Sequence, residues 1–218
     1  MIDLHTHSLF SDGELILSEL IRRAEAIGYK AIAITDHVDS SNIDFVVPKI
    51  VSTIKKLRSL FSIEVIPGAE ITHAPPHIIH DLVKEARHLG AKIVLVHGET
   101  IVEPVAPGTN KEAIEANVDI LAHPGTISEE DLLLAKEKGV TLEITSRKGH
   151  SLSNGYVAKE AMRFGVPLCI NTDTHSPLDL ITKEFAIKIL LASGIDGNRI
   201  NSIFDHSKTL VEKALRRD

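Results

Sequence analysis

Short apolar segments recur along the chain and alternate with longer segments in which apolar residues follow a helical spacing. Most of the short segments are rich in β-branched residues and apolar throughout, which is typical of parallel strands buried on both faces. They predict seven strands, at residues 1–4, 31–35, 63–67, 92–96, 118–122, 140–144 and 167–171.

The longer segments predict helices, because their apolar residues recur three or four positions apart and so fall on one face. One of them is marked at both ends, since Ser128 opens a capping motif and Gly139 follows the last predicted turn. The predicted helices span 15–28, 46–61, 77–89, 110–117, 128–138, 153–164 and 181–193, and two more close the chain at 197–204 and 206–216.

Polar residues at the ends of the predicted strands decide between two architectures. Alternating strands and helices imply a parallel sheet with right-handed crossovers, either open and doubly wound or closed into a barrel. Functional residues of such folds lie at the carboxyl ends of the strands. A His, Asp or Glu follows six of the seven predicted strands. Because an open sheet would gather its site residues near one crevice, this ring of residues favours an α/β barrel.

Nine of these side chains form a candidate metal site. Residues i and i+2 on a strand point to the same face, so His5 and His7 can both face the barrel axis, as can Asp173 and His175. A catalytic ion of the zinc type takes about three protein ligands, so nine ligands indicate about three divalent metal ions. Mixed histidine and carboxylate ligands suit Zn, Mn or Fe. The candidates are His5, His7, Asp12, His37, Glu70, His97, His123, Asp173 and His175.

Composition excludes several classes of protein. The 218 residues are 43% hydrophobic and 25% charged, ordinary values for a globular protein, and no apolar run reaches the length of a membrane span. The net charge of −6 does not suggest a general nucleic-acid binder. A single cysteine, Cys169, excludes an intramolecular disulfide, and the first residues lack the basic region of a signal peptide. We therefore expect a cytoplasmic protein without a membrane or nucleic-acid partner.

Six ordered motifs resemble the PHP (polymerase and histidinol phosphatase) domain family, in particular its smaller histidinol-phosphatase-like members. The resemblance implies a distorted (β/α)7 TIM-like barrel, with residues 1–218 forming a single PHP domain, and a trinuclear metal centre at the carboxyl end of the barrel. The motifs are HTHSLFSDGE at 5–14, ITDH at 34–37, PGAE at 67–70, VHGE at 96–99, AHP at 122–124 and NTDTH at 171–175.

The resemblance also implies how the ligands are shared among three ions. His5 and His7 would hold the first ion with Glu70 and Asp173. Glu70 would bridge to a second ion, held by His97 and His123. The third ion would be held by Asp12, His37 and His175. Some relatives have histidine where this chain has Asp12, which on its own could equally be a turn residue or helix cap.

The function implied by the resemblance is metal-dependent hydrolysis of a small-molecule phosphomonoester, with histidinol phosphate or a nucleotide-like phosphate as substrate. Arg147, after the sixth predicted strand, is a candidate phosphate clamp, although Arg147 and Lys148 could be a solvated loop pair. The expected catalytic residues are Glu70, Asp173, His175 and Arg147.

Three other functions stay open at this stage. A nuclease or proofreading phosphodiesterase is one, because PHP domains also occur in DNA polymerases, and a non-catalytic metal-binding module is another. The amidohydrolase family shares the HxH opening, but its binuclear members typically use a modified lysine after the fourth strand, where this chain has His97.

The remaining polar residues receive weaker interpretations. Glu143 could contact a metal ligand or a cationic group of the substrate, and Asp36 is expected to be a partner of a ligand or a turn residue. His73 and His150 are candidates for contact with substrate at the rim. We assign the other histidines to the surface, namely His77, His80, His88 and His206.

Overall fold

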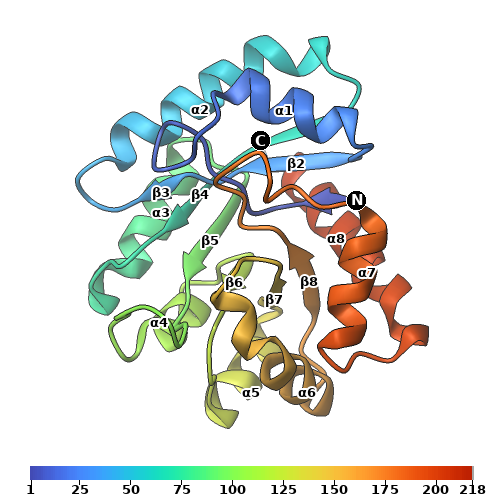
Figure 1. Ribbon diagram of the computed structural model, residues 1–218. Coiled ribbons are helices and arrows are strands. Elements are labelled where there is room, and N and C mark those ends of the chain that lie inside the picture. Colours follow the sequence, from blue (N-terminus) through green and yellow to red (C-terminus); the bar gives the residue numbers. More distant parts are fainter. Residues whose placement is uncertain (218) are drawn as a thin grey trace.

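The computed structural model describes residues 1–217 and contains a nearly closed barrel of seven parallel strands with helices around it (Figure 1). The strand order is β1-β2-β4-β5-β6-β7-β8, and the short strand β3 pairs with β4 beyond the end of β2. This confirms the predicted α/β fold and its distorted TIM-like form. The strands are β1 (Ile2–Asp3), β2 (Ala31–Ile34), β3 (His37–Val38), β4 (Glu64–Ile71), β5 (Ile93–His97), β6 (Ile120–Ala122), β7 (Thr141–Thr145) and β8 (Leu168–Asn171).

The helices follow the strands in the predicted order and lie outside the barrel (Figure 1). At α5 the side chain of Ser128 accepts a hydrogen bond from the backbone N–H of Asp131, and Gly139 closes the helix at φ 69°, as its capping motif predicts. The helices are α1 (Leu17–Ala26), α2 (Ile43–Leu57), α3 (Ile79–His88), α4 (Thr109–Glu115), α5 (Glu129–Lys138), α6 (Asn154–Phe164), α7 (Lys183–Ala192) and α8 (Ile200–Leu215).

Alternation along the strands divides the apolar core into two layers. Inward-facing side chains such as Ala33, Ile66 and Leu95 fill the barrel, while outward-facing residues pack under the helices. Leu210 and Val211 of α8 belong to the inner layer, so this last helix covers the amino ends of the strands. The opposite end of the barrel, where the strands finish, is left to the connecting loops.

The seam between the first and last strands is closed by few contacts. Thr6 and Thr174 form one isolated parallel bridge just beyond the ends of β1 and β8. Next to it, the Leu4 N–H donates to Asn171 Oδ1 at 2.9 Å, and Thr172 Oγ1 donates to Asp3 Oδ2 at 2.6 Å. Side chains therefore complete what the backbone ladder leaves open.

Two strand predictions need correction. Strand β4 runs to Ile71, beyond the predicted end at residue 67, so Glu70 lies within the strand instead of after it. Pro67 and Gly68 resemble a strand end in sequence, yet the Pro67 carbonyl accepts from the Lys92 N–H at 2.8 Å and the ladder continues. The two-residue strand β3 is absent from the prediction because so short a segment has no measurable periodicity.

The predicted break between two helices at residues 197–204 and 206–216 is wrong. A short 3₁₀ turn leads into α8, which is continuous from Ile200 to Leu215. Buried residues recur along it at Ile203, Ser207, Leu210 and Ala214. Neither glycine nor proline interrupts this stripe, so one helix buries it more completely than two would.

Candidate functional site

Strand alternation carries polar side chains to the open end of the barrel. In β5, Ile93 and Leu95 face the interior, and His97 is the next residue on that face. In β4, Ile66 faces inward, and Glu70 follows four positions later on the same face. A polar layer therefore lies directly above the apolar layer, at the carboxyl ends of the strands.

The first group of site residues lies at the seam and is almost completely buried. His5 Nε2 lies 3.2 Å from Glu70 Oε1 and 3.6 Å from Asp173 Oδ1. His7 Nε2 lies 3.2 Å from the same Asp173 oxygen and 3.8 Å from Glu70 Oε2. His123 approaches both carboxylates, with its Nε2 3.8 Å from Glu70 Oε1 and 3.7 Å from Asp173 Oδ2. The two carboxylates thus lie among three histidines from two strand ends, those of β1 and β6.

The second group lies nearer the solvent. His37 Nε2 lies 3.3 Å from His175 Nε2 and 3.4 Å from Asp12 Oδ1. The distance from His175 Nε2 to Asp12 Oδ1 is 3.2 Å. Ligand atoms of a tetrahedral zinc ion with bonds of about 2.0–2.1 Å lie roughly 3.3–3.4 Å apart. These three atoms therefore already have the mutual spacing that such an ion requires.

The third group joins the predicted residues His97 and His123 to a neighbour. One ring nitrogen each from His97, His123 and the buried His150 lie within 4.8 Å of one another. Glu103, on the loop between β5 and α4, places Oε2 3.1 Å from His97 Nε2 and Oε1 3.4 Å from His150 Nε2. No local motif marks Glu103 in the sequence, and our sequence analysis missed it.

Several histidines are anchored through Nδ1, which leaves Nε2 facing the site. His5 Nδ1 contacts Glu143 Oε1 at 2.8 Å, His97 Nδ1 contacts the Gly98 carbonyl at 3.2 Å, and His175 Nδ1 contacts the Asp173 carbonyl at 3.0 Å. Each of these partners is an acceptor, so Nδ1 donates and a neutral ring presents an Nε2 lone pair. Second partners of this kind typically fix the orientation of metal-bound histidines.

Unpaired polar atoms test whether the residues of the site fit metal ions. Within residues 1–217, both ring nitrogens of His7 and of His123 are buried without a hydrogen-bond partner, as are His5 Nε2, Glu70 Oε1 and Asp173 Oδ1. Each such group costs about 1–3 kcal/mol when buried. Divalent cations would satisfy lone pairs and carboxylate oxygens together, so the donor set fits metal ions.

The pKa values at the site reflect this crowding. Burial tends to raise the pKa of Glu70, but the neighbouring His5 and His37 hold it well below its usual range. Burial raises the pKa of Asp173 to about 7. Although burial opposes it, the carboxylates of Glu143, Glu70 and Asp173 raise the pKa of His5 well above its ordinary value. In the metal-free protein, protons therefore supply part of the positive charge that the two carboxylates require.

Backbone strain accompanies the cluster. In residues 1–217, four residues other than glycine have positive φ, and three of them are His73 at 51°, His123 at 28° and Asp173 at 54°. Such conformations cost about 1–3 kcal/mol and tend to occur at functional sites. His123 directly follows β6, and Asp173 is the second residue after β8. Their positive φ turns the backbone so that both side chains lie at the mouth of the barrel.

A cavity of about 230 Å³ opens above the clusters, and its lining includes Asp12, His37, His97, Glu103, Arg147 and Asp173. Arg147 Nε lies 3.9 Å from Asp173 Oδ2, and Arg147 Nη1 lies 3.5 Å from Asp179 Oδ2. The Arg147 side chain therefore reaches the cavity, whereas Lys148 is exposed. Asp179, which the sequence analysis missed, also accepts from the backbone N–H groups of His175 and Ser176.

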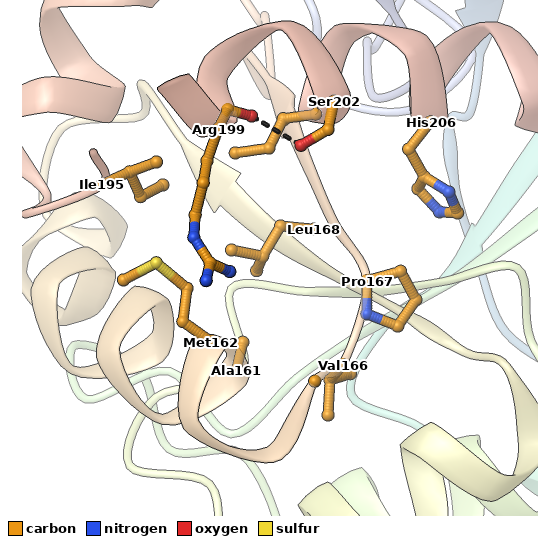
Figure 2. Close-up of a pocket in the computed structure, with 11 residues that line it drawn as sticks. Ala161, Met162, Val166, Pro167, Leu168, Ile195, Arg199, Ser202 and His206 are labelled. Carbon is orange, nitrogen blue, oxygen red and sulfur yellow. Dashed lines mark hydrogen bonds between the residues drawn. The ribbon is translucent and has the colours of Figure 1, made fainter. Parts of the chain in front are cut away.

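A second cavity of about 330 Å³ lies far from these residues, at the start of β8 between α6 and α8. Figure 2 shows Met162, Leu168, Ile195 and Arg199 around it. His206 also lines this cavity and pairs its Nε2 with Thr141 Oγ1 at 2.8 Å, so it is half-buried. The assignment of His206 to the surface is therefore wrong, since a polar partner inside the fold holds the ring.

The structure brings all nine candidate ligands together at one end of the barrel. Their assignment as ligands remains a prediction, as do the catalytic roles of Glu70, Asp173, His175 and Arg147. His73 and His150 reach the same cavity, and Glu143 contacts His5 directly. Asp36 accepts from Ser8 and Ser11 and so holds the first loop. The three remaining histidines predicted at the surface are exposed, namely His77, His80 and His88.

Comparison with protein-family models now decides the family. The model of the PHP domain matches residues 3–151, which include the two strand-borne site residues Glu70 and His97. The chain belongs to the PHP domain family. The resemblance seen in the sequence motifs is thereby confirmed, and a PHP-type metal-dependent phosphoesterase is the general class that the relatives indicate.

Two relatives match most of the PHP chain. An uncharacterized protein of Methanocaldococcus jannaschii is 49% identical over 214 residues, which cover 97% of this chain and 98% of the relative. A protein of Thermoanaerobacter sp. named a probable phosphatase is 27% identical over 222 residues, with 89% of this chain and 87% of the relative covered.

Two solved structures share the fold. A chain of an archaeal ribonuclease P determined with mature tRNA superposes with a TM-score of 0.74 at 19% identity, covering 99% of this chain and 93% of that one. Histidinol phosphate phosphatase from Lactococcus lactis, complexed with zinc, L-histidinol and phosphate, gives 0.63 at 17% identity, with 89% and 94% covered. Among the helices of residues 1–217, none combines the length and apolar character needed to cross a membrane.

Proposed function

We propose that this PHP protein is a metal-dependent phosphatase that hydrolyses a small-molecule phosphomonoester at a trinuclear centre. The observation that carries the proposal is the convergence of three adjacent histidine–carboxylate groups, the most buried of which contains side-chain nitrogen and oxygen atoms that lack hydrogen-bond partners in residues 1–217. The relative named a probable phosphatase and the fold of histidinol phosphate phosphatase support the same chemistry.

In this proposal, each group of residues has its own ion. His5 and His7 hold the first with Asp173, His97 and His123 hold the second, and Glu70 bridges the two. Asp12, His37 and His175 hold the third. Divalent ions bound there would lower the pKa of water and offset charge on the phosphoryl oxygens.

Arg147 positions the phosphate in this scheme. Its guanidinium lies at the cavity wall between the Asp173 and Asp179 side chains, which orient it. A guanidinium can bind two phosphoryl oxygens at once and stays protonated throughout. Because Arg147 comes from the loop after β7, it would approach the phosphate beside the metal ligands that follow β8.

The size of the cavity favours a small substrate. Its volume of about 230 Å³ is below the roughly 300–1,000 Å³ of pockets that bury drug-sized ligands. Such a cavity can hold a phosphoryl group and part of a leaving alcohol. Histidinol phosphate and nucleotide-like phosphates are the first candidates, the former because the structural neighbour from L. lactis binds L-histidinol and phosphate.

One observation favours a second candidate, a non-catalytic component of a larger assembly. The chain of archaeal ribonuclease P shares this fold over nearly the whole length of both proteins. The net charge of −6 argues against broad contact with RNA, and the complete set of nine candidate ligands argues for retained chemistry.

The test incubates purified protein with added Zn²⁺ or Mn²⁺ and measures phosphate release from histidinol phosphate and nucleoside monophosphates, alcohol release from a model phosphodiester, and fragment formation from single-stranded RNA. We expect one monoester to reach a kcat/KM of about 10⁴ M⁻¹s⁻¹ or more. The Glu70→Gln variant, which loses the bridge, should lose at least one metal equivalent and nearly all turnover. Faster cleavage of the diester or RNA would favour a nuclease. Bound metal without release from any ester would favour the non-catalytic candidate.

A further inference from the structure

We propose that His150 and Glu103 bind the ion held by His97 and His123, so that this corner of the site offers four protein side chains to one metal in addition to the bridging Glu70. The inference rests on the proposed metal centre and extends it. The family resemblance places His97 and His123 there, with Glu70 as a bridge, and assigns no role to His150 or Glu103.

Glu103 lies beside two of the three histidines, at distances close to those between ligands of one ion. Glu103 Oε2 lies 3.1 Å from His97 Nε2, and Glu103 Oε1 lies 3.4 Å from His150 Nε2. Ligand atoms around a tetrahedral zinc ion lie roughly 3.3–3.4 Å apart. The His123 and His150 rings stack with centroids 4.1 Å apart, so both rings can turn a nitrogen toward one point.

The outer nitrogens of two rings are already anchored. His97 Nδ1 donates to the Gly98 carbonyl at 3.2 Å, and His150 Nδ1 pairs with Thr100 Oγ1 at 2.8 Å. Metal binding requires the neutral form of His97, whose Nε2 lone pair and the nearby Glu103 carboxylate oxygen could then bind one cation together.

An independent observation comes from His123, which is 2% exposed. Neither of its ring nitrogens has a hydrogen-bond partner in residues 1–217, although the ring packs between His97 and His150. A buried imidazole without any partner is costly. An ion at this corner would provide one for it.

Glu103 and His150 differ in how firmly they are held. The His150 side chain is 7% exposed and fixed by Thr100, whereas the Glu103 side chain is 38% exposed at the cavity. His73 positions Glu103, because its Nε2 contacts Glu103 Oε2 at 3.1 Å. His150 is therefore the permanent ligand, and Glu103 is the ligand that an incoming phosphate oxygen replaces, since a catalytic ion needs an open position.

The experiment titrates metal-free protein with Zn²⁺ against a chromophoric chelator and counts bound equivalents, for wild type, His150→Gln and Glu103→Gln. The exposed residues His80 and Glu115 provide matched controls as His80→Gln and Glu115→Gln. We expect His150→Gln to weaken one zinc equivalent at least tenfold, and Glu103→Gln to weaken the same equivalent. A Co²⁺-loaded sample should change its visible spectrum in both variants and in neither control.

Inorganic phosphate separates the two roles. If phosphate replaces Glu103, then Zn²⁺-loaded Glu103→Gln should bind phosphate severalfold more tightly than wild type in a calorimetric titration. Wild type that binds zinc, with unchanged affinities and spectra in both variants, would overturn this inference and leave the proposed function standing. Wild type that binds no zinc would overturn both.

Discussion

His5 Nδ1 lies 2.8 Å from Glu143 Oε1, and the two fully buried side chains are 138 positions apart in the chain. The same carboxylate accepts from Asn171 Nδ2 at 2.8 Å and from the His123 N–H at 3.3 Å. Glu143 thus connects the segments that follow β1 and β6 with β8 from its own strand β7. It controls the tautomer and orientation of His5 without belonging to the predicted ligands.

Replacing Glu143 with glutamine should therefore weaken metal binding while the fold is kept. Glutamine has nearly the same shape as glutamate but carries no negative charge. The charge of Glu143 raises the pKa of His5 and so makes the His5 ring a more basic metal ligand. We expect metal affinity or kcat/KM to fall about 10–100-fold. Chelator competition and circular dichroism measure the two properties, with exposed Glu137→Gln as the control. Unchanged affinity would show that His5 needs no anionic partner.

Arg147→Lys should lower affinity for phosphate more than it changes metal content. Lysine keeps the charge but loses the planar pair of donors, and a charge-assisted hydrogen bond is worth about 1.5–3 kcal/mol. The inhibition constant of inorganic phosphate should rise by roughly tenfold or more. Lys148→Met, next in the chain and exposed, should leave that constant unchanged. Equal effects of the two substitutions would contradict a specific clamp.

Metal affinity should keep rising above pH 6.5. Burial opposes it, but neighbouring carboxylates raise the pKa of His5, His37 and His97, so the metal-free protein retains protons there that a metal ion must displace. For each proton that the metal displaces, metal affinity rises about tenfold per unit increase in pH, until the pH exceeds the pKa of that histidine. These protonated rings stabilise the metal-free fold below pH 6.5, and that contribution is lost as pH rises through the raised pKa values. Zinc titrations from pH 6 to 9 test this, and a plateau beginning at pH 6.5 would contradict it.

Gly125→Ala should be more destabilising than Gly139→Ala. Both glycines have similar positive φ, 63° and 69°, so alanine meets the same backbone strain of about 1–2 kcal/mol at each. Only at Gly125 would the new methyl group overlap the Glu99 carbonyl, whereas Gly139 has open space. The overlap should add about 1–3 kcal/mol to the loss in the free energy of unfolding. Urea denaturation compares the two, and equal losses would show that the Glu99 loop yields freely.

The sequence predicts most of this site because its key residues follow strands of regular pattern. Strand alternation predicts that His5 and His7, and Asp173 and His175, reach the same end of the barrel, which they do, although both pairs lie beyond the ends of β1 and β8. Glu70 is predicted at the correct end of the barrel although β4 runs further than expected. The Pro67–Gly68 pair conceals this extension, because in sequence it looks like a turn. The fold shows instead that Gly68 is needed within the strand, where a Cβ would meet Ile93 Cγ2 at 2.7 Å.

The residues that the sequence analysis missed are those placed by loops. Glu103 belongs to a loop without a motif, and its approach to His97 and His150 depends on how β5 and β7 are spaced in the barrel. Glu143 has two possible roles in the sequence, and only its distance from His5 decides between them. Loop contacts of this kind depend on tertiary packing, which local patterns do not encode.

Because the metal site lies at the seam of the barrel, a bound ion would also help to hold the barrel closed. Leu4 and Asn171, whose hydrogen bond helps to close it, are 167 positions apart, and candidate ligands follow both strands. An ion shared by His5, His7 and Asp173 would act as a crosslink joining the first and last strands. Such a crosslink lowers the entropy of the unfolded chain, and the resulting stabilisation grows with the length of chain it encloses. Removing the ion should thus open the seam first. This opening would be seen as faster amide hydrogen exchange at β1 and β8, while strands on the opposite side of the barrel stay protected.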